Sequence, residues 1–418
     1  MRYLYSLLLY LLVPFVILRL LWRSLRAPAY RRRWGERFGF FERLPVEGVV
    51  WVHAVSVGEV QAAVPLIAWL REEKNLPVLV TTTTPTGSER VRQRFGDQVF
   101  HVYAPYDLPD AVRRFLKRVR PRLAIVMETE IWPNLFRRCQ RAGIPLVVAN
   151  ARLSIRSAAR YRQFQTLIKA TLRRASVVAA QTQADAGRFV SLGMEAARVQ
   201  VTGNIKFDVS LPAELRERAV QLRRNWGERR PVWVAASTHL GEEEAVLSAF
   251  AMVRNRLPEV LLILVPRHPE RFDKVAELCR RRGYGLVRRS EGGVVGEETA
   301  VFLGDTMGEL PLFYAAADVA FVGGSMVPTG GHNILEPAAL GVPVVVGPHT
   351  FNFLEIVRAL LGQGGGERVW NEAELATAVV RYLEDPKLRD AAGSCGRELV
   401  ERNRGALAKL QALLAGYV

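Results

Sequence analysis

The stretch Val49-Val-Trp-Val-His53, followed by Ala54-Val-Ser-Val-Gly-Glu59, carries the pattern on which the fold prediction rests. A run of β-branched and aromatic residues predicts a buried strand, and the small residues after it predict a tight loop. A helix is then expected to begin near Gly58. The same order of strand, loop and helix recurs along the chain, which predicts parallel sheets with crossover helices.

Two sets of strands follow from this pattern, and together they predict two doubly wound, Rossmann-like α/β domains. The expected strands are 48–52, 78–82, 123–127, 146–149, 177–180, and then 232–235, 261–265, 301–303, 319–322 and 344–346. A length of 418 residues agrees with this number of domains. We place the boundary near Asp208, giving domains 23–208 and 209–418. Ligands of such sheets bind beyond the carboxyl ends of the strands.

The first 22 residues are expected to form a membrane-anchor helix. Residues 3–18 carry no charge and would cover about 24 Å, short of the roughly 30 Å hydrocarbon core of a bilayer. With the run extended to Trp22 and Arg19 snorkelling, the segment could just span. A spanning helix, a helix lying in the interface and a buried core helix all fit this composition. By the positive-inside rule, the arginines that follow keep the body of the protein in the cytoplasm. They are Arg23, Arg26, Arg31, Arg32, Arg33 and Arg37.

The charge balance points to an anionic partner. There are 58 Lys and Arg against 41 Asp and Glu, a net charge of +17. Nucleic acid, an acidic membrane face and a phosphorylated substrate all fit such a balance. The three cysteines form no CxxC pair, and the six histidines form no HExxH motif. We therefore expect neither a metal site nor a cofactor.

Carboxylates follow two of the first-domain strands. Glu59 is expected at a helix N-terminus beyond the strand 49–53, where it could accept a proton from a substrate hydroxyl or simply complement the helix dipole. Glu128 and Glu130 follow the strand 123–127, and in an extended segment both would point to one side. The alternative for this pair is a polar loop before a helix that starts at Pro133.

Further polar residues lie at the domain junction and beyond the second-domain strands. Lys206 could meet a phosphate or a carboxylate, or be an ordinary hinge lysine. Arg267 and His268 end an apolar strand, and arginine there suits a bidentate phosphate contact. Residues 304–310 form a loop that opens a helix. The glycine-rich stretch 321–337 suits phosphate binding through backbone N–H groups, although it matches neither a Walker loop nor GxGxxG.

Six of these segments, taken together and in this order, resemble the bacterial 3-deoxy-D-manno-octulosonic acid (Kdo) transferase family. The segments are SVGE at 56–59, METEIWPN at 127–134, GNIKFD at 203–208, PRHPERF at 266–272, GDTMGEL at 304–310 and GGHNILEP at 330–337. The resemblance covers nearly the whole chain. It implies a GT-B fold, in which two Rossmann-like domains face a cleft, the first binding the acceptor and the second the nucleotide.

The resemblance also implies the reaction and its residues. The donor would be CMP-Kdo, and the acceptor the anionic glucosamine disaccharide precursor of lipid A at the membrane surface. Glu59 would be the general base of an inverting displacement, with Glu128 and Lys206 around the transition state and no metal. Asn333 and Glu336 would contact CMP, although Glu336 could instead reach back to cap its helix. The complete implied CMP site is Arg267, His268, Met307, Gly308, Glu309, Asn333, Ile334, Leu335 and Glu336.

Two other classes of protein remain as alternatives from the sequence. A nucleotide-sugar epimerase shares the two-domain architecture, but it acts on soluble substrates and needs no anchor. A non-catalytic nucleic-acid-binding protein would account for the isoelectric point of 10.3. Against it, the chain shows no nucleic-acid motif and no interleaving of aromatic and basic residues. We therefore expect no nucleic-acid partner.

Overall fold

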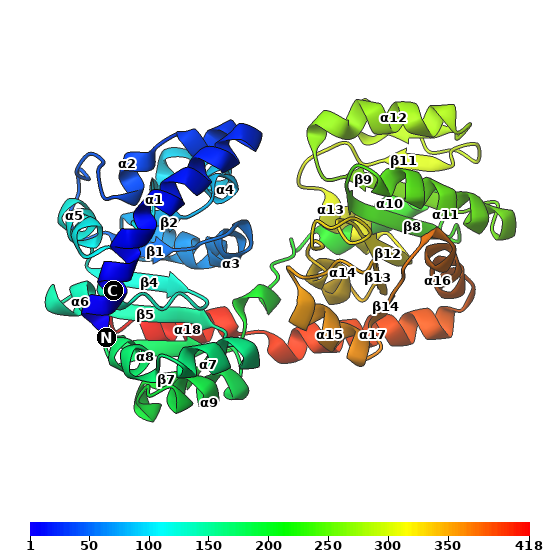
Figure 1. Cartoon of the computed structure of the whole chain (residues 1–418). Coiled ribbons are helices and arrows are strands. Elements are labelled where there is room, and N and C mark those ends of the chain that lie inside the picture. Colours follow the sequence, from blue (N-terminus) through cyan, green and yellow to red (C-terminus); the bar gives the residue numbers. More distant parts are fainter. The chain divides into compact units, whose positions relative to one another are not determined.

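The computed structural model describes residues 1–418, apart from the side chain of Arg26. The chain forms two compact units (Figure 1). The first unit comprises Met1–Lys206 together with Arg404–Val418, and the second comprises Phe207–Asn403. Each is described by itself.

The first unit contains a parallel seven-stranded sheet in the order β3-β2-β1-β4-β5-β6-β7. Its strands are β1 Val50–His53, β2 Val78–Thr82, β3 Phe100–Tyr103, β4 Leu123–Met127, β5 Leu146–Ala151, β6 Val177–Ala180 and β7 Val199–Val201. The central β1 pairs with both β2 and β4, so that His53 lies opposite Thr81 and Val126. The strand order reverses between β1 and β4, and this switch point is where such sheets bind ligands.

Helices cover both faces of this sheet. They are α1 Arg2–Arg26, α2 Trp34–Arg37, α3 Val57–Ala68, α4 Pro85–Phe95, α5 Pro109–Val119, α6 Pro133–Arg141, α7 Ile155–Arg162, α8 Gln165–Leu172, α9 Gln183–Ser191 and α18 Ala406–Leu414. Alternate residues of β1 enter different cores: Trp51 packs with Phe115 on one face, and Val52 packs with Ile67 on the other. This is the period-two burial of a strand that is covered on both sides.

The last helix, α18, belongs to the first unit, whereas the sequence placed residues 209–418 in one domain. Ala406, Leu410 and Leu414 are spaced four residues apart, so they share one helix face, and all three are buried in the core that contains Ile67. A Cβ on Gly203 would come within 3.0 Å of the Ala406 Cβ, which shows how closely α18 approaches the end of β7. We therefore assign residues 404–418 to the first unit.

The second unit repeats the architecture with a parallel sheet in the order β10-β11-β9-β8-β12-β13-β14. Its strands are β8 Val232–Thr238, β9 Leu261–Pro266, β10 Leu286–Arg288, β11 Val301–Leu303, β12 Val319–Val322, β13 Val344–Val346 and β14 Gly366–Arg368. Its helices are α10 Leu215–Trp226, α11 Glu242–Arg256, α12 Phe272–Arg281, α13 Leu310–Ala315, α14 Leu335–Leu340, α15 Leu354–Gly362, α16 Glu372–Glu384 and α17 Pro386–Asn403. The predicted pair of doubly wound domains is confirmed.

The apolar N-terminal stretch forms one continuous helix, α1, which lies across the first unit (dark blue in Figure 1). By length and composition α1 is able to cross a membrane. Only a small part of it is buried, including Leu20 and Ser24, and most of its leucines are exposed. The expected anchor helix is therefore present as a helix, and its contacts with the body are considered below.

Candidate active site

Glu59 lies in the first turn of α3, directly beyond the carboxyl end of β1. Ser56 caps the helix by accepting from the Glu59 backbone N–H, and its hydroxyl donates to Glu59 Oε1 at 3.0 Å. The backbone N–H of Val55 donates to Glu59 Oε2 at 2.8 Å. These contacts are those of a capping box in which the N–H of Val55 takes the place of the N–H of the N-cap residue, and they hold the carboxylate in one orientation. Glu59 therefore caps its helix and at the same time stands at the ligand-binding edge of the sheet.

Burial and neighbouring charge change the acidity of Glu59. Burial raises its pKa to about 7, the negative charge of Glu128 adds to the rise, and the hydrogen bonds from Val55 and Ser56 oppose it. Glu130 contributes a further, smaller increase. A carboxyl group with a pKa near neutrality has the proton affinity that a general base needs at physiological pH.

Glu128 does not continue β4 in the extended conformation that the sequence predicted. Its φ is +56°, in the left-handed region, where a non-glycine residue costs roughly 1–3 kcal/mol. The two carboxylates have different partners, and Glu130 accepts a hydrogen bond from Trp132 Nε1 at 2.7 Å. Glu128 Oε1 instead accepts from Lys206 Nζ at 3.0 Å. The expectation that Glu128 and Glu130 share one side of an extended segment is thus wrong.

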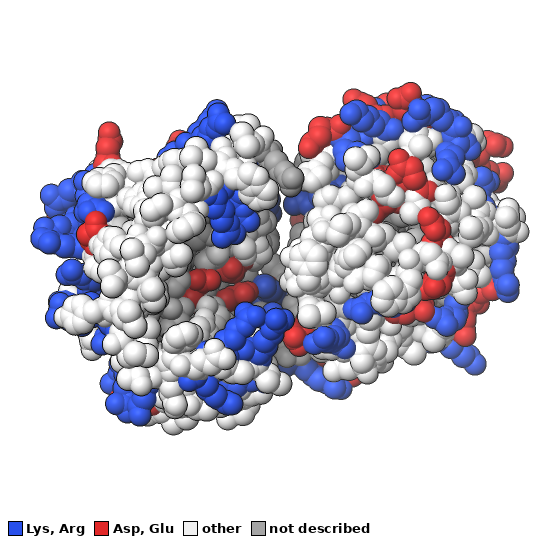
Figure 2. Space-filling view, in the orientation of Figure 1, with Lys and Arg blue, Asp and Glu red and all other residues white. Residues whose placement is uncertain are grey.

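The structure brings the three predicted first-unit residues together. Glu128 acts electrostatically on both Glu59 and Glu130, and Lys206 supplies the positive charge beside it. In Figure 2, acidic side chains line the floor of a hollow on one face of the first unit, with basic side chains at its edge. A hollow of this kind suits a polar acceptor that carries negative groups at its periphery.

Asn150, in β5, fixes the loop that carries Lys206, and the sequence reasoning did not single it out. It is fully buried with φ +51°, and its Oδ1 accepts from the backbone N–H of Ile205 at 3.1 Å. Asn204 Oδ1 accepts from the Lys206 N–H at 3.0 Å. A polar residue near the end of an otherwise apolar strand was the signal available for Asn150.

In the second unit, three histidines lie together: His239 beyond β8, His268 beyond β9, and His332 in the loop between β12 and α14. The His239 and His332 rings are stacked within 2° of parallel, with 2.7 Å between their Nε2 atoms. The His239 and His268 ring centroids are 5.2 Å apart. Burial lowers the pKa of His332 to about 3, and the positive charge of Arg267 adds to this effect. Arg267 and His268, which the sequence singled out, thus lie beside this histidine pair. His239 was missed, although it lies just beyond the predicted strand 232–235.

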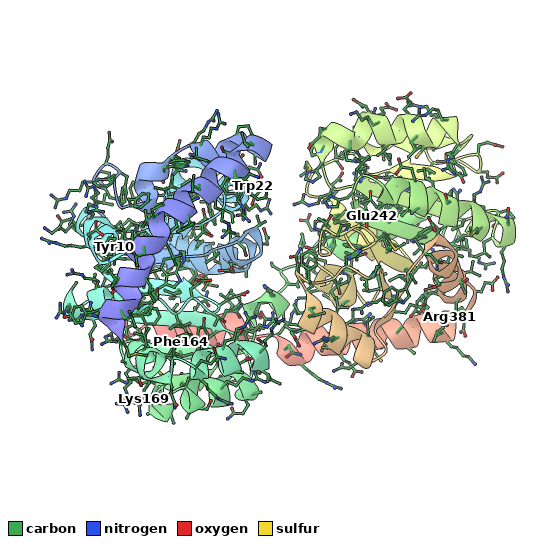
Figure 3. All side chains as sticks on the ribbon, in the orientation of Figure 1. Tyr10, Trp22, Phe164, Lys169, Glu242 and Arg381 are labelled. Carbon is green, nitrogen blue, oxygen red and sulfur yellow. The ribbon has the colours of Figure 1, made fainter. Side chains whose placement is uncertain are left out.

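The glycine-rich loop after β12 differs from its expected role. Glu242, the fully buried first residue of α11 (labelled in Figure 3), accepts backbone N–H groups from this loop and from His239. The loop donors are Gly324 at 2.7 Å, Met326 at 2.8 Å and Ser325 at 2.9 Å. A carboxylate of the chain itself therefore occupies the donors that were expected to hold a phosphate.

The residues at the start of α14 follow His332 directly in sequence and have different roles. Asn333 accepts from the Leu335 N–H at 3.1 Å and donates to Glu336 Oε1 at 3.0 Å, so Glu336 does reach back towards Asn333. Burial raises the pKa of Glu336. The side chains of Ile334 and Leu335 are buried in the core. These two residues therefore present only backbone groups to a ligand.

The predicted stretch Met307–Glu309 makes its contacts elsewhere in the second unit. Arg289 donates to both oxygens of Glu309 at 2.7 and 2.9 Å, and these bonds lower the Glu309 pKa to about 2. Gly308 has φ +86°, and the Met307 side chain is 67% exposed. Glu309 thus fixes the loop, while Met307 remains open to contact. Among the described side chains, no cluster of three or more His, Cys, Asp or Glu is placed to hold a metal ion.

Solved structures define the class of protein. UDP-GlcNAc 2-epimerase from Neisseria meningitidis has a TM-score of 0.55 at 16% identity, covering 88% of this chain and 100% of that one. Anabaena HepE in complex with UDP has a TM-score of 0.53 at 18% identity, covering 88% and 99%. At these identities the likeness concerns the fold alone. Residues 286–399 match the family model "Glycosyl transferases group 1". The fold is that of the GT-B glycosyltransferases.

Sequence relatives define the family. Residues 32–209 match the model "3-Deoxy-D-manno-octulosonic-acid transferase (kdotransferase)". The 3-deoxy-D-manno-octulosonic acid transferase of Haemophilus influenzae is 44% identical over 100% of this chain and 99% of its own length. That of Bordetella pertussis is 39% identical, covering 92% and 90%. The chain belongs to the Kdo transferase family. The resemblance drawn from the six segments is confirmed, and the epimerase and nucleic-acid-binding alternatives are set aside.

Proposed function

We propose that the protein transfers Kdo from CMP-Kdo to the phosphorylated glucosamine disaccharide precursor of lipid A, a step of lipopolysaccharide synthesis. Family membership supports the transferred sugar. The observation that carries the catalytic part is Glu59, a carboxyl group with a pKa of about 7 at the switch point of the first sheet. The first domain would bind the acceptor, and the second would bind the donor.

The proposed reaction is a single displacement that inverts the anomeric carbon. Glu59 accepts the proton of an acceptor hydroxyl while the hydroxyl oxygen bonds to the anomeric carbon of Kdo. The bond from that carbon to the phosphate oxygen breaks, and CMP leaves with the electron pair. Lys206, held by Glu128 at 3.0 Å, places a positive charge beside the reacting groups and limits the accumulation of negative charge.

Arg267 is the proposed partner of the departing CMP phosphate. It follows β9 directly, and its backbone N–H donates to Thr238 O at 2.9 Å. Among the described side chains, no carboxylate pairs with its guanidinium group, which leaves that charge for a ligand. The neutral His239–His332 pair lies within the field of this arginine. An arginine and neutral imidazole groups suit a monophosphate leaving group without a metal.

The membrane location is also proposed. The α1 helix is apolar enough to bind a bilayer, and the acceptor is an anionic amphiphile. The arginines that follow α1 favour attachment on the cytoplasmic side of the inner membrane. The enzyme would then meet its acceptor within the lipid surface.

The test combines purified protein, CMP-Kdo and the lipid A precursor, with product masses read by mass spectrometry. We expect CMP release only when the lipid is present, a product heavier by whole Kdo residues, and equal yield in EDTA. CMP release without acceptor, or a modified soluble sugar as the only product, would contradict the proposal. A strict requirement for added magnesium would contradict its metal-free part.

A further inference from the structure

The α1 helix has two faces of different character along its whole length. One face is an exposed apolar stripe whose members recur every three or four residues, the spacing of a single helix face. The stripe residues are between 50% and 71% exposed. They are Leu4, Leu8, Leu11, Phe15, Leu18, Trp22 and Leu25.

The other face is fastened to the body by polar side chains. Tyr5 OH donates to Asp107 Oδ2 at 3.0 Å, and Tyr10 OH (labelled in Figure 3) donates to Asp110 Oδ1 at 2.5 Å. Ser6 Oγ and the Asn134 side-chain amide lie 3.1–3.2 Å apart. These contacts tie the amino-terminal half of α1 to the loop before α5, to the first turn of α5 and to the start of α6.

Asp107 connects this attachment to the fold itself. The carboxylate is buried, and it caps α6 by accepting the backbone N–H groups of Asn134 at 3.0 Å and Leu135 at 2.7 Å. Tyr5 is therefore the third donor to a carboxylate that the domain already uses. A buried carboxylate that lost this donor would be left with an unsatisfied lone pair.

The contact continues to the carboxyl end of the helix. Leu20 and Ser24 are buried, and Arg31 Nε donates to Ser24 Oγ at 3.0 Å. The docked face thus runs from Tyr5 to Ser24, which at a rise of 1.5 Å per residue is about 28 Å. This is nearly the full thickness of a hydrocarbon core, roughly 30 Å. If α1 crossed the bilayer while docked, the charged surface beside it would lie in hydrocarbon, where such groups are costly.

Basic side chains lie at both ends of the exposed stripe. At the amino-terminal end, burial and the charges of Arg137, Arg2 and Arg141 lower the pKa of Arg174, so these four arginines lie near one another. At the other end are Arg19, Arg23 and Arg31 on α1 and the turn after it. An apolar stripe with cationic groups at both ends is complementary to an anionic lipid surface.

We propose that α1 does not span the membrane but lies in the plane of an anionic lipid surface, with its stripe buried in lipid and its Tyr5–Tyr10–Ser24 face docked on the first unit. The inference deepens the proposed membrane attachment and rests on it. In this arrangement the docked helix holds the first unit directly against the lipid surface, and no flexible linker separates α1 from the rest of that unit.

Attachment itself is tested by sedimentation with vesicles of phosphatidylethanolamine and phosphatidylglycerol. Leu11→Glu with Phe15→Glu is expected to lower the bound fraction at least tenfold. The control is Val294→Glu, at a residue that is 87% exposed in the second unit, and it should bind as the parent does. Unchanged binding of the double variant would overturn the role of the stripe. If the parent protein forms a dimer and does not bind vesicles, the stripe is covered by a second copy of the chain instead. That result would also overturn the membrane attachment.

Orientation is tested separately by cross-linking, so that its failure is distinguishable from a failure of attachment. In a Cys395→Ser background, Ser6→Cys with Asn134→Cys is expected to form a disulfide in the vesicle-bound fraction. Leu7→Cys with Asn134→Cys, whose first cysteine lies on the exposed side, should not. The remaining native cysteines, Cys139 and Cys279, are buried. A bound fraction in which the first pair does not cross-link would overturn the docked, in-plane position.

A topology measurement gives the second readout. Tyr3→Cys lies at the amino-terminal end of α1, 78% exposed in the parent residue. A membrane-impermeant maleimide applied to spheroplasts should leave this cysteine unlabelled, because an in-plane helix keeps both its ends on the cytoplasmic side. Labelling in intact spheroplasts would show that α1 crosses the membrane and would overturn the inference, while leaving the attachment intact.

Discussion

Glu128 and Lys206 form an ion pair of 3.0 Å between residues that are 78 positions apart in the chain. Each partner is fixed by backbone geometry: Glu128 by its left-handed turn after β4, and Lys206 by the loop that Asn150 and Asn204 hold. The pair links the end of β4 to the residue at which the first unit gives way to the second. Glu59, the proposed general base, whose pKa is raised by burial and then by the charge of Glu128, is thereby connected to the domain junction.

Replacing Glu59 by Gln is expected to lower turnover by about 10²–10⁴-fold, the usual contribution of general base catalysis. The amide oxygen of Gln can still accept from the Val55 N–H, and its NH₂ group can donate to Ser56 Oγ, so α3 should remain capped. Single-turnover kinetics and a thermal unfolding curve measure the two effects. Near-normal turnover would leave Glu59 as a capping residue only.

The raised pKa of Glu59 sets the expected pH dependence. The base must be ionised, so turnover should rise with pH through about pH 7 and level off above it. Glu128→Gln removes the charge that adds to the rise, so the acid limb of the profile should move to lower pH. The measurement is turnover against pH for both proteins. An acid limb that stays in place would show that Glu128 does not act on the titrating group.

Stability should carry the opposite pH dependence from activity. The ordinary pKa of a glutamate is 4.5, and folding raises that of Glu59 to about 7. Between these values the folded chain binds a proton that the unfolded chain has released, so Glu59 lowers the free energy of unfolding as the pH rises through this window. Glu59→Gln should reduce the fall. Denaturant unfolding at pH 5 and pH 7 gives the free energy of unfolding of both proteins at each pH. An equal decrease in this free energy from pH 5 to pH 7 would count against the raised pKa.

Arg267→Ala should weaken CMP-Kdo binding by about 1.5–3 kcal/mol, the value of a charge-assisted hydrogen bond, and should spare lipid binding. The matched control is Arg280→Ala, at an exposed position on α12 of the same unit. Calorimetric titration of each ligand separates the effects. Equal loss for donor and lipid, in a folded protein, would give Arg267 a structural role.

Glu242→Ala should both destabilise the second unit and weaken donor binding. The substitution leaves four backbone N–H groups without their acceptor, at a cost of about 1–3 kcal/mol for each one that stays buried. Glu242→Gln keeps one acceptor oxygen and should retain more of both properties. Denaturant unfolding ranks the stability of the parent, Gln and Ala proteins, and donor titration ranks their affinity for CMP-Kdo. Donor binding that improves in the Ala variant would show that Glu242 competes with the phosphate.

Sequence reasoning found ten of the fourteen strands because buried parallel strands appear as short β-branched runs with polar loops after them, as at Leu123–Met127. It missed β3, β7, β10 and β14, which are the edge strands of the two sheets. It selected Glu59, Glu128 and Lys206 as candidate site residues by their places beyond such runs and by family resemblance. It did not find the left-handed backbone of Glu128 or the partnership of Glu242 with the glycine loop. Both depend on contacts between segments far apart in the chain, and local patterns do not encode such contacts.

The placement of α18 was missed for a related reason. Its leucines predict a buried helix face, but a helix with this pattern could pack on either sheet. His239 and His332 were missed as a pair because they lie 93 positions apart, and each alone is an unremarkable loop residue. Periodicity predicts that a helix face is buried or that a residue ends a strand. The tertiary partner of that face or residue is known only from the folded structure.

Because α18 closes the first unit, the second unit is an insertion within it. The peptide chain passes between the units at Lys206 and again at Asn403. During synthesis, the first sheet emerges from the ribosome long before Leu410 and Leu414, which complete one of its two cores. The domain that begins to fold first is therefore finished last. Until then, the surface that α18 will cover is exposed apolar protein, available to chaperones.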